Sequence, residues 1–312
     1  MSCRKGYEVI SGGKSVTKNI AASVRQKLKN QADQDKRPFA ELLQYYAMER
    51  FLYRLTQSEH SECFILKGAL MLRAWKSPEI RPTMDIDMLG KTSNEVDAIR
   101  AQIADISAIE FDDGLIFDPG TIRGEIIKED ADYEGVRVRF NGTLDNARVP
   151  MQIDVGFGDI VHPEPVETEL PTILDFPAPK LLCYSRESAI AEKFEAMIKL
   201  GELNSRMKDF YDTWLLSRQF EFNGMELAEA VRLTLEHRGT EIPEVITAFT
   251  DGFVTSKEGQ WKAFYKRLGQ EHVPVDFAEV VTSVKVFLQP VADALIASEE
   301  FKRKWTISDY WL

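Results

Sequence analysis

The stretch RPTMDIDMLG, residues 81–90, constrains the fold more than any other, because it places two aspartates on either side of one isoleucine among apolar residues. Side chains alternate between the two faces of an extended strand, so Asp85 and Asp87 emerge on one face and their apolar neighbours on the other. Two carboxylates this close repel each other, and both lose hydration if the strand is buried. A divalent cation would remove the conflict, so the motif predicts a metal site on a strand.

Length and composition set the limits of the interpretation. The chain has 312 residues, 44% of them hydrophobic and 29% charged, which is typical of a soluble globular protein with about two domains. We expect a cytoplasmic protein, because no apolar run is long enough to cross a membrane and the N-terminus lacks the apolar core of a signal peptide. The three cysteines, Cys3, Cys63 and Cys183, are far apart and predict free thiols. The net charge of −11 argues against extensive coating by nucleic acid but leaves room for a local basic patch.

The chain divides into segments with different sequence patterns. Residues 15–58 repeat apolar residues at helical spacing, and their aromatic residues predict a packed stripe. Strand-like runs follow from Cys63 to Phe157, interrupted by one helical segment, SNEVDAIRAQIADI. A proline-rich segment excludes helix and central strand over 161–180, and helical spacing returns beyond it. We therefore expect an α+β protein with N-terminal helices and a small mixed sheet in residues 1–160, a linker at 161–180 and a helical bundle at 181–312.

Two further features extend the site. The segment QIDVGFGD offers a third strand carboxylate, Asp154, although Asp159 nearby competes for that role. Three carboxylates would suit two Mg²⁺ or Mn²⁺ ions, which activate an attacking hydroxyl and neutralise a leaving pyrophosphate. Asp154 is the predicted ligand nearest the nucleophile. Upstream, FILKGALMLRAW predicts a strand, a tight turn at Gly68 and a helix from Ala69, whose free N–H groups would bind phosphate oxygens.

These motifs together resemble the AbiEii/AbiGii toxin family of nucleotidyltransferases, within the DNA polymerase β-like superfamily. The resemblance rests on Gly-x-Leu followed by RPTxDIDxLG, on the later strand aspartate, on PFAELLQYYAMERFLYRL, and on AEKFEAMIKLGELNSRMKDFYD. It covers about residues 15–220. It implies a nucleotidyltransferase core, a nucleoside triphosphate (NTP) and a metal ion as partners, and a role as the toxin of a two-gene toxin–antitoxin or phage-defence system. Some relatives add nucleotides to the acceptor end of tRNA.

The resemblance also assigns residues. Asp85 and Asp87 match the family's metal-binding pair, and Gly68 matches the glycine of its phosphate-binding turn. Ala69 departs from the usual Gly-Ser or Gly-Gly and removes a hydroxyl from that turn. In the helical part, the predicted nucleotide-site and catalytic residues are Lys193, Arg206, Lys208 and Asp209. Spacing alone leaves simpler explanations open: Lys193 could be a solvated helix residue, and the pairs Lys208/Asp212 and Arg206/Asp209 could be surface ion pairs.

The predicted reaction is transfer of a nucleoside monophosphate from an NTP to an RNA acceptor, with the tRNA 3′ end as the expected acceptor and a cognate antitoxin encoded nearby. A polyanionic acceptor needs basic residues, and six cluster in sequence: Lys180, Arg186, Lys193, Lys199, Arg206 and Lys208. Two alternatives stay open. One is nucleotidylation of a protein or small-molecule hydroxyl. The other is a non-catalytic NTP-binding toxin, which the missing hydroxyl at Ala69 keeps credible.

Overall fold

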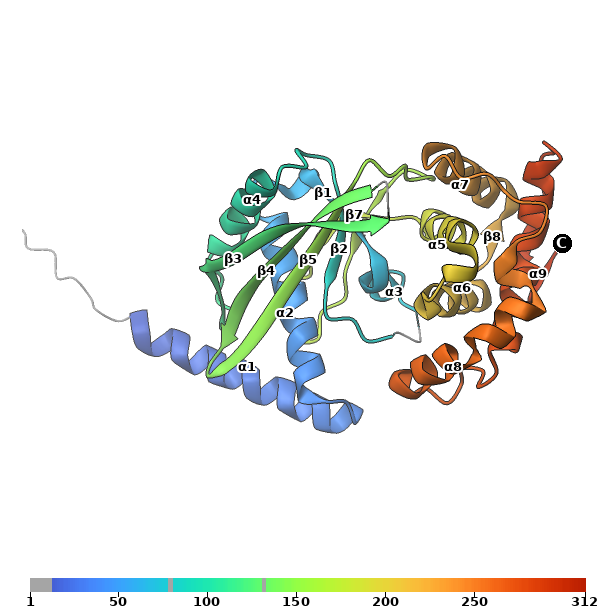
Figure 1. Ribbon diagram of the computed structural model, residues 1–312. Coiled ribbons are helices and arrows are strands. Elements are labelled where there is room, and N and C mark those ends of the chain that lie inside the picture. The colour runs from blue at the N-terminus through green and yellow to red at the C-terminus, as the bar shows by residue number, and fades with distance from the viewer. Residues whose placement is uncertain (1–12, 78–80, 131–132) are drawn as a thin grey trace, which may run out of the picture. The chain divides into compact units, whose positions relative to one another are not determined.

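The computed structural model describes residues 13–77, 81–130 and 133–312 (Figure 1). Contacts divide the chain into two compact units. The sheet unit comprises the described residues of Met1–Phe64, Thr83–Phe157 and Glu169–Leu181. The helical unit comprises those of Ile65–Pro82, Gly158–Thr168 and Leu182–Leu312.

The sheet unit is built on a twisted run of strands. Its elements are α1 (Gly13–Asp35), α2 (Phe39–Thr56), β2 (Ile86–Gly90), α4 (Val96–Ala108), β3 (Leu115–Asp130), β4 (Tyr133–Leu144) and β5 (Ala147–Phe157). The strands follow the order β3-β4-β5-β2. The β3–β4 and β4–β5 pairs are antiparallel, whereas β2 and β5 run parallel. Parallel pairing sets the two strands that carry the predicted acidic residues side by side.

The two faces of this sheet differ in polarity. Along β4, Val136, Val138 and Phe140 are buried, and Arg137 and Arg139 alternate with them on the opposite face. The apolar face packs against helices: α2 contacts β5, α4 contacts β3 and β4, and α2 crosses behind β4 and β5 in Figure 1. The alternation therefore leaves a polar face on the other side of the same strands.

Helix α2 supplies much of the core under the sheet. Its aromatic residues form the predicted packed stripe: Tyr46 and Phe51 are fully buried, and the Phe51 ring lies 5.5 Å from that of Phe140. The buried Arg54 donates two hydrogen bonds to Asp113, at 2.7 and 3.0 Å. A bidentate pair of this kind satisfies both charges inside the core and fixes α2 to the loop before β3.

The helical unit contains a turn-forming segment and a bundle. Its elements are β1 (Phe64–Lys67), α3 (Met71–Ala74), α5 (Arg186–Leu200), α6 (Met207–Gln219), β8 (Phe222–Asn223), α7 (Gly224–His237), α8 (Asp251–Leu268), α9 (Phe277–Ile296), β9 (Lys304–Thr306) and β10 (Tyr310–Trp311). Phe194, Phe210 and Phe287 are fully buried in its aromatic core. Strands β10, β9 and β8 form a small antiparallel sheet.

Within the described residues, the larger sheet is mixed and has seven strands, in the two runs β3-β4-β5-β2 and β1-β7-β6. The short strands β6 (Val166–Glu169) and β7 (Lys180–Cys183) lie at the two ends of the proline-rich segment, and β7 pairs in parallel with β1. The α+β fold with a mixed sheet and C-terminal helices is confirmed. The domain boundaries stay a prediction.

Some strands, the cysteines and the hydropathy of the helices can also be compared with the sequence predictions. Strands β3, β6 and β7 and the sheet of β8, β9 and β10 were not predicted. Cys63 and Cys183 are free thiols, as expected, and Cys3 lies outside the described residues. Among the described helices, none combines the length and apolar character that crossing a membrane requires.

Candidate functional site

Three carboxylates meet on the polar face of the sheet unit. In the parallel pairing of β2 and β5, Asp87 stands directly opposite Asp154, and Asp85 lies immediately before β2. One oxygen of each side chain lies within 4.8 Å of the corresponding oxygens of the other two. The structure thus brings together all three predicted metal ligands, which we call the acidic triad. Asp159, the predicted competitor, is not part of it.

The surroundings of the acidic triad hold its side chains in place. Asp154 is buried, whereas Asp85 and Asp87 are half-buried. The Thr83 hydroxyl donates a hydrogen bond to the Asp85 carboxylate. From the neighbouring strand β4, Arg137 donates two hydrogen bonds to Asp154, at 2.7 and 2.6 Å. The hydrogen bond to Asp154 is the main reason that the pKa of Arg137 is raised.

The donor set fits a hard divalent cation. Carboxylate oxygens are the ligands that Mg²⁺ and Mn²⁺ prefer in proteins. Each oxygen carries more than one acceptor position, so Asp154 can accept from Arg137 and still bind an ion. Repulsion among three neighbouring carboxylates is the physical reason for a cation at this position.

The predicted strand, turn and helix around Gly68 are present in the helical unit. Strand β1 ends at Lys67, and Gly68 has a φ of +75°, a left-handed conformation that glycine adopts without strain. One 3₁₀ turn, Gly68–Leu70, then leads into α3. Because α3 has four residues, its dipole is too small to provide the phosphate site that the sequence suggested. Any phosphate contact here would depend on the backbone N–H groups of the turn.

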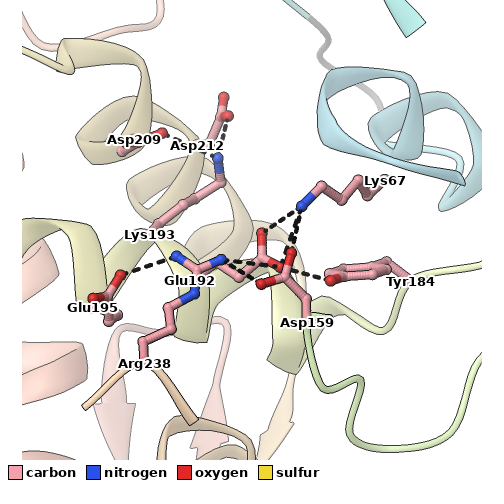
Figure 2. Close-up of polar contacts among 9 residues, drawn as sticks. All are labelled: Lys67, Asp159, Tyr184, Glu192, Lys193, Glu195, Asp209, Asp212 and Arg238. Atoms are coloured by element: carbon pink, nitrogen blue, oxygen red, sulfur yellow. Dashed lines mark hydrogen bonds and ion pairs between the residues drawn. The ribbon is translucent and has the colours of Figure 1, made fainter. Parts of the chain in front are cut away.

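Lys67, directly before the turn, is held by a network of buried charges that sequence reasoning missed (Figure 2). Its Nζ lies 2.9 Å from Asp159 and 3.5 Å from Glu192. Arg238 contacts Asp159 at 2.7 Å and Glu195 at 3.0 Å. We call these five residues the Lys67 network. Their positions are up to about 170 residues apart along the chain, so no local spacing could reveal them.

Burial and pairing oppose each other in the Lys67 network. Burial alone would raise the pKa of Asp159, but Lys67 and Arg238 outweigh it and lower that pKa to about 2. For Glu192 burial dominates and raises the pKa, and the Tyr184 hydroxyl donates a hydrogen bond to its carboxylate at 2.6 Å. Asp159 therefore stays ionised over the whole physiological range.

Lys193 and the acidic residues of α6 form a second group of buried charges (Figure 2). Lys193 lies 2.9 Å from Asp212 and 3.3 Å from Asp209. Asp212 also accepts two hydrogen bonds from Arg81, and Asp209 contacts Arg206 at 3.0 Å. Burial would lower the pKa of Lys193, but the negative charges of Asp212 and Asp209 outweigh burial and the pKa is raised. The ammonium group therefore stays charged.

These contacts test the simpler explanations, namely a solvated Lys193 and surface ion pairs on α6. Lys193 is not a solvated helix residue, because only 17% of its side chain is exposed and it pairs with two aspartates. Asp212 pairs with Lys193 and Arg81, so the surface pair Lys208/Asp212 is not formed and Lys208 is exposed. The pair Arg206/Asp209 is formed. Lys193, Arg206 and Asp209 are thus brought together, whereas Lys208 is not part of the group.

The basic residues predicted to hold RNA are largely occupied by contacts within the chain. Lys180 lies 3.6 Å from Glu169, and the Arg186 guanidinium lies over the Phe220 ring at 4.6 Å. Lys193 and Arg206 pair with aspartates of α6. These contacts within the chain weaken the case for this patch.

Comparisons with known proteins concern the family and the fold of the chain. No curated protein sequence matches the chain. Two solved structures share 16% sequence identity with it: JHP933 from Helicobacter pylori, with a TM-score of 0.49, and an H. pylori "putative nucleotidyltransferase", with a TM-score of 0.46. Both matches cover 83% of this chain, and they cover 94% and 97% of the respective relatives. Residues 50–283 match the family "Nucleotidyl transferase AbiEii toxin, Type IV TA system". The chain belongs to this family and is a nucleotidyltransferase toxin of a type IV toxin–antitoxin system.

Proposed function

We propose that the chain transfers a nucleoside monophosphate from an NTP to the 3′-terminal hydroxyl of an RNA, with tRNA as the first candidate acceptor. The observation that carries the proposal is the acidic triad, in which one oxygen from each carboxylate lies within 4.8 Å of the other two, at two parallel strands and the residue before one of them. Family membership supports the transfer, and the sequence resemblance to relatives that extend tRNA supports the acceptor.

In this proposal the side chains have separate tasks. Asp85, Asp87 and Asp154 would hold Mg²⁺ or Mn²⁺, and a bound ion would supply positive charge for the reacting phosphate and the leaving pyrophosphate. Thr83 and Arg137 keep Asp85 and Asp154 in position through the hydrogen bonds described above. Lys193 keeps its positive charge for the outer phosphates. The backbone N–H groups at Gly68 and Ala69 are the proposed donors to the triphosphate.

The direct test incubates the protein with each labelled NTP and either total tRNA or total cell protein, with Mg²⁺ or with EDTA. We expect label in tRNA, only with the metal. Asp85→Asn should lower the rate by about 10²- to 10³-fold or more, because it removes charge stabilisation in the transition state. Asp97→Asn is the matched control: its side chain is 90% exposed on α4, so its rate should equal that of the wild type.

The same experiment separates the alternatives. Label in protein rather than RNA would replace the proposed acceptor by a protein hydroxyl. Growth inhibition that persists in Asp85→Asn, with no transfer of any NTP by the wild type, would favour toxicity through NTP binding alone. The cognate antitoxin, which a type IV system implies, should relieve growth inhibition when expressed together with the chain.

A further inference from the structure

The acidic triad shares its sheet face with several arginines. Across β3, β4 and β5 the register aligns Arg123 with Arg139 and Arg139 with Gln152, and the next row aligns Arg137 with Asp154. Residues two apart along a strand point to the same face, so these side chains emerge beside Asp154. Arg148 lies on the same face of β5, where it donates a hydrogen bond to Asn141 at 3.0 Å.

Three of these residues, Arg123, Arg139 and Arg148, form what we call the arginine strip. Arg123 donates to the backbone carbonyls of Gly120 and Ile122. Among the described residues, neither Arg123 nor Arg148 forms an ion pair with a carboxylate. Arg139 pairs with Glu125, and about half of each side chain is exposed. Exposed pairs of this kind contribute little to stability, so Arg139 can exchange its partner at low cost.

Two residues of the arginine strip border a groove of about 480 Å³, and Glu125, the partner of Arg139, borders it as well. Arg123 and Arg139 line it, together with the apolar surfaces of Met84 and Pro150. Met84 is 56% exposed although it is apolar, and it directly precedes Asp85 in the sequence. Gln152 also lines the groove and donates a hydrogen bond to Asp154. The groove therefore starts beside the acidic triad and combines guanidinium groups with an apolar floor.

We propose that the arginine strip binds the backbone phosphates of the single-stranded 3′ segment of the acceptor RNA. The inference rests on the proposed nucleotidyl transfer and names the surface that holds its acceptor. Guanidinium groups recognise phosphates, and an apolar floor accommodates the faces of bases. Because the whole chain has a net charge of −11, attraction of a polyanion must come from a local surface such as this one.

The test measures binding without catalysis. Fluorescence anisotropy of a 5′-labelled single-stranded RNA is recorded against protein concentration at several salt concentrations, in EDTA and without NTP. For the double variant Arg123→Ala/Arg148→Ala we expect affinity to fall by about tenfold or more and the salt slope to shrink by about 1.4, because two cations are removed. Thermal unfolding of the variant should match that of the wild type, since neither residue pairs with a carboxylate.

Arg100→Ala is the matched control. Arg100 belongs to α4, and a Cβ built on Gly124 would touch its side chain, which shows that it lies on the side of β3 opposite Arg123. This variant should bind RNA as the wild type does. A second comparison, Lys199→Glu/Arg206→Glu, tests the basic patch predicted in the helical part.

The outcomes separate this inference from the proposed function. Asp85→Asn should stop transfer and keep RNA binding. Unchanged affinity and salt slope in Arg123→Ala/Arg148→Ala would overturn the arginine strip, whether or not the wild type transfers nucleotides. A loss of affinity confined to Lys199→Glu/Arg206→Glu would also overturn it. The same holds for a wild type that binds no RNA and instead retains an acidic protein on this face. Intact binding by the strip without any transfer would instead remove the proposed function.

Discussion

The acidic triad of the sheet unit places like charges next to one another, whereas the Lys67 network of the helical unit alternates opposite charges. In the network, Asp159 lies between Lys67 and Arg238, so each buried charge has an internal partner. In the triad, the nearest neighbours of Asp87 include two further carboxylates. In the Lys67 network each of the three carboxylates contacts Lys67 or Arg238. In the triad Arg137 pairs with Asp154, and the close approach of three carboxylates still favours a bound cation. The two clusters thus differ in the balance of charge: cations and carboxylates alternate in the Lys67 network, whereas carboxylates lie together in the triad.

The largest expected effect comes from removing one carboxylate of the acidic triad. Asp87→Asn should lower nucleotidyl transfer by about 10²- to 10³-fold or more, because a metal ligand is lost. Asparagine is close to aspartate in size and the change removes one of three neighbouring negative charges, so the variant should still fold without metal. Transfer assays and urea unfolding in EDTA measure the two effects. A variant that loses stability and keeps its transfer rate would contradict this assignment.

The next prediction concerns the removal of Arg238 from the Lys67 network. Arg238→Met leaves Asp159 and Glu195 buried without this partner, and removing one member of a buried pair costs about 3–5 kcal/mol of unfolding free energy. Urea unfolding measures it. Arg232→Met is the matched control, because Arg232 pairs with glutamates on the exposed side of α7, where about 0–1 kcal/mol is expected. Equal costs in both variants would refute the contrast.

A pH titration sharpens the same contrast. The pKa of Asp159 is lowered from 3.8 to about 2, so the folded state binds this proton less readily than the unfolded state. Its stabilisation is therefore fully present above pH 3.8 and is lost as the pH falls towards 2, by about 2 kcal/mol in total. The measurement compares the free energy of unfolding in urea at about pH 4.5 and about pH 2.5, in the wild type and in Asp159→Asn. If both lose the same stability, Asp159 does not carry the effect.

The smallest effect concerns the turn. Ala69→Ser restores a hydroxyl beside Gly68, and one additional hydrogen bond to a phosphate oxygen would contribute about 0.5–1.5 kcal/mol, or about 2- to 12-fold in NTP affinity. Calorimetric titration with a non-hydrolysable NTP measures this. Unchanged or weaker binding would show that the side chain at residue 69 does not face the triphosphate.

Features set by neighbouring residues in the sequence could be predicted. The two-residue spacing of Asp85 and Asp87 predicted their common face, and FILKGAL predicted a strand followed by a turn at Gly68. The long strand β3 was missed because Pro119, Gly120 and Gly124 interrupt its β-type pattern, and its register with β4 shifts between Asp118 and Arg123.

Partners distant in sequence could not be predicted. Arg137 meets Asp154 only because β4 and β5 pair in one particular register. Lys67 and Glu192 are separated by 125 residues. A single sequence contains no signal for such contacts, since each residue on its own resembles an ordinary charged surface position. For the same reason the spacing of Lys208 and Asp212 left a surface ion pair open as an alternative, whereas in the fold Asp212 pairs with Arg81 and Lys193.

The position of Ile86 has a consequence for how this chain tolerates change. Ile86 is fully buried and pairs with Ile153, so the strand is fixed with one side chain in the core and its two acidic neighbours outside. Replacing it by valine or leucine keeps that division. Inserting or deleting a single residue between the two aspartates would turn one of them into the core, so mutations of chain length here should be far less tolerated than mutations of side-chain size.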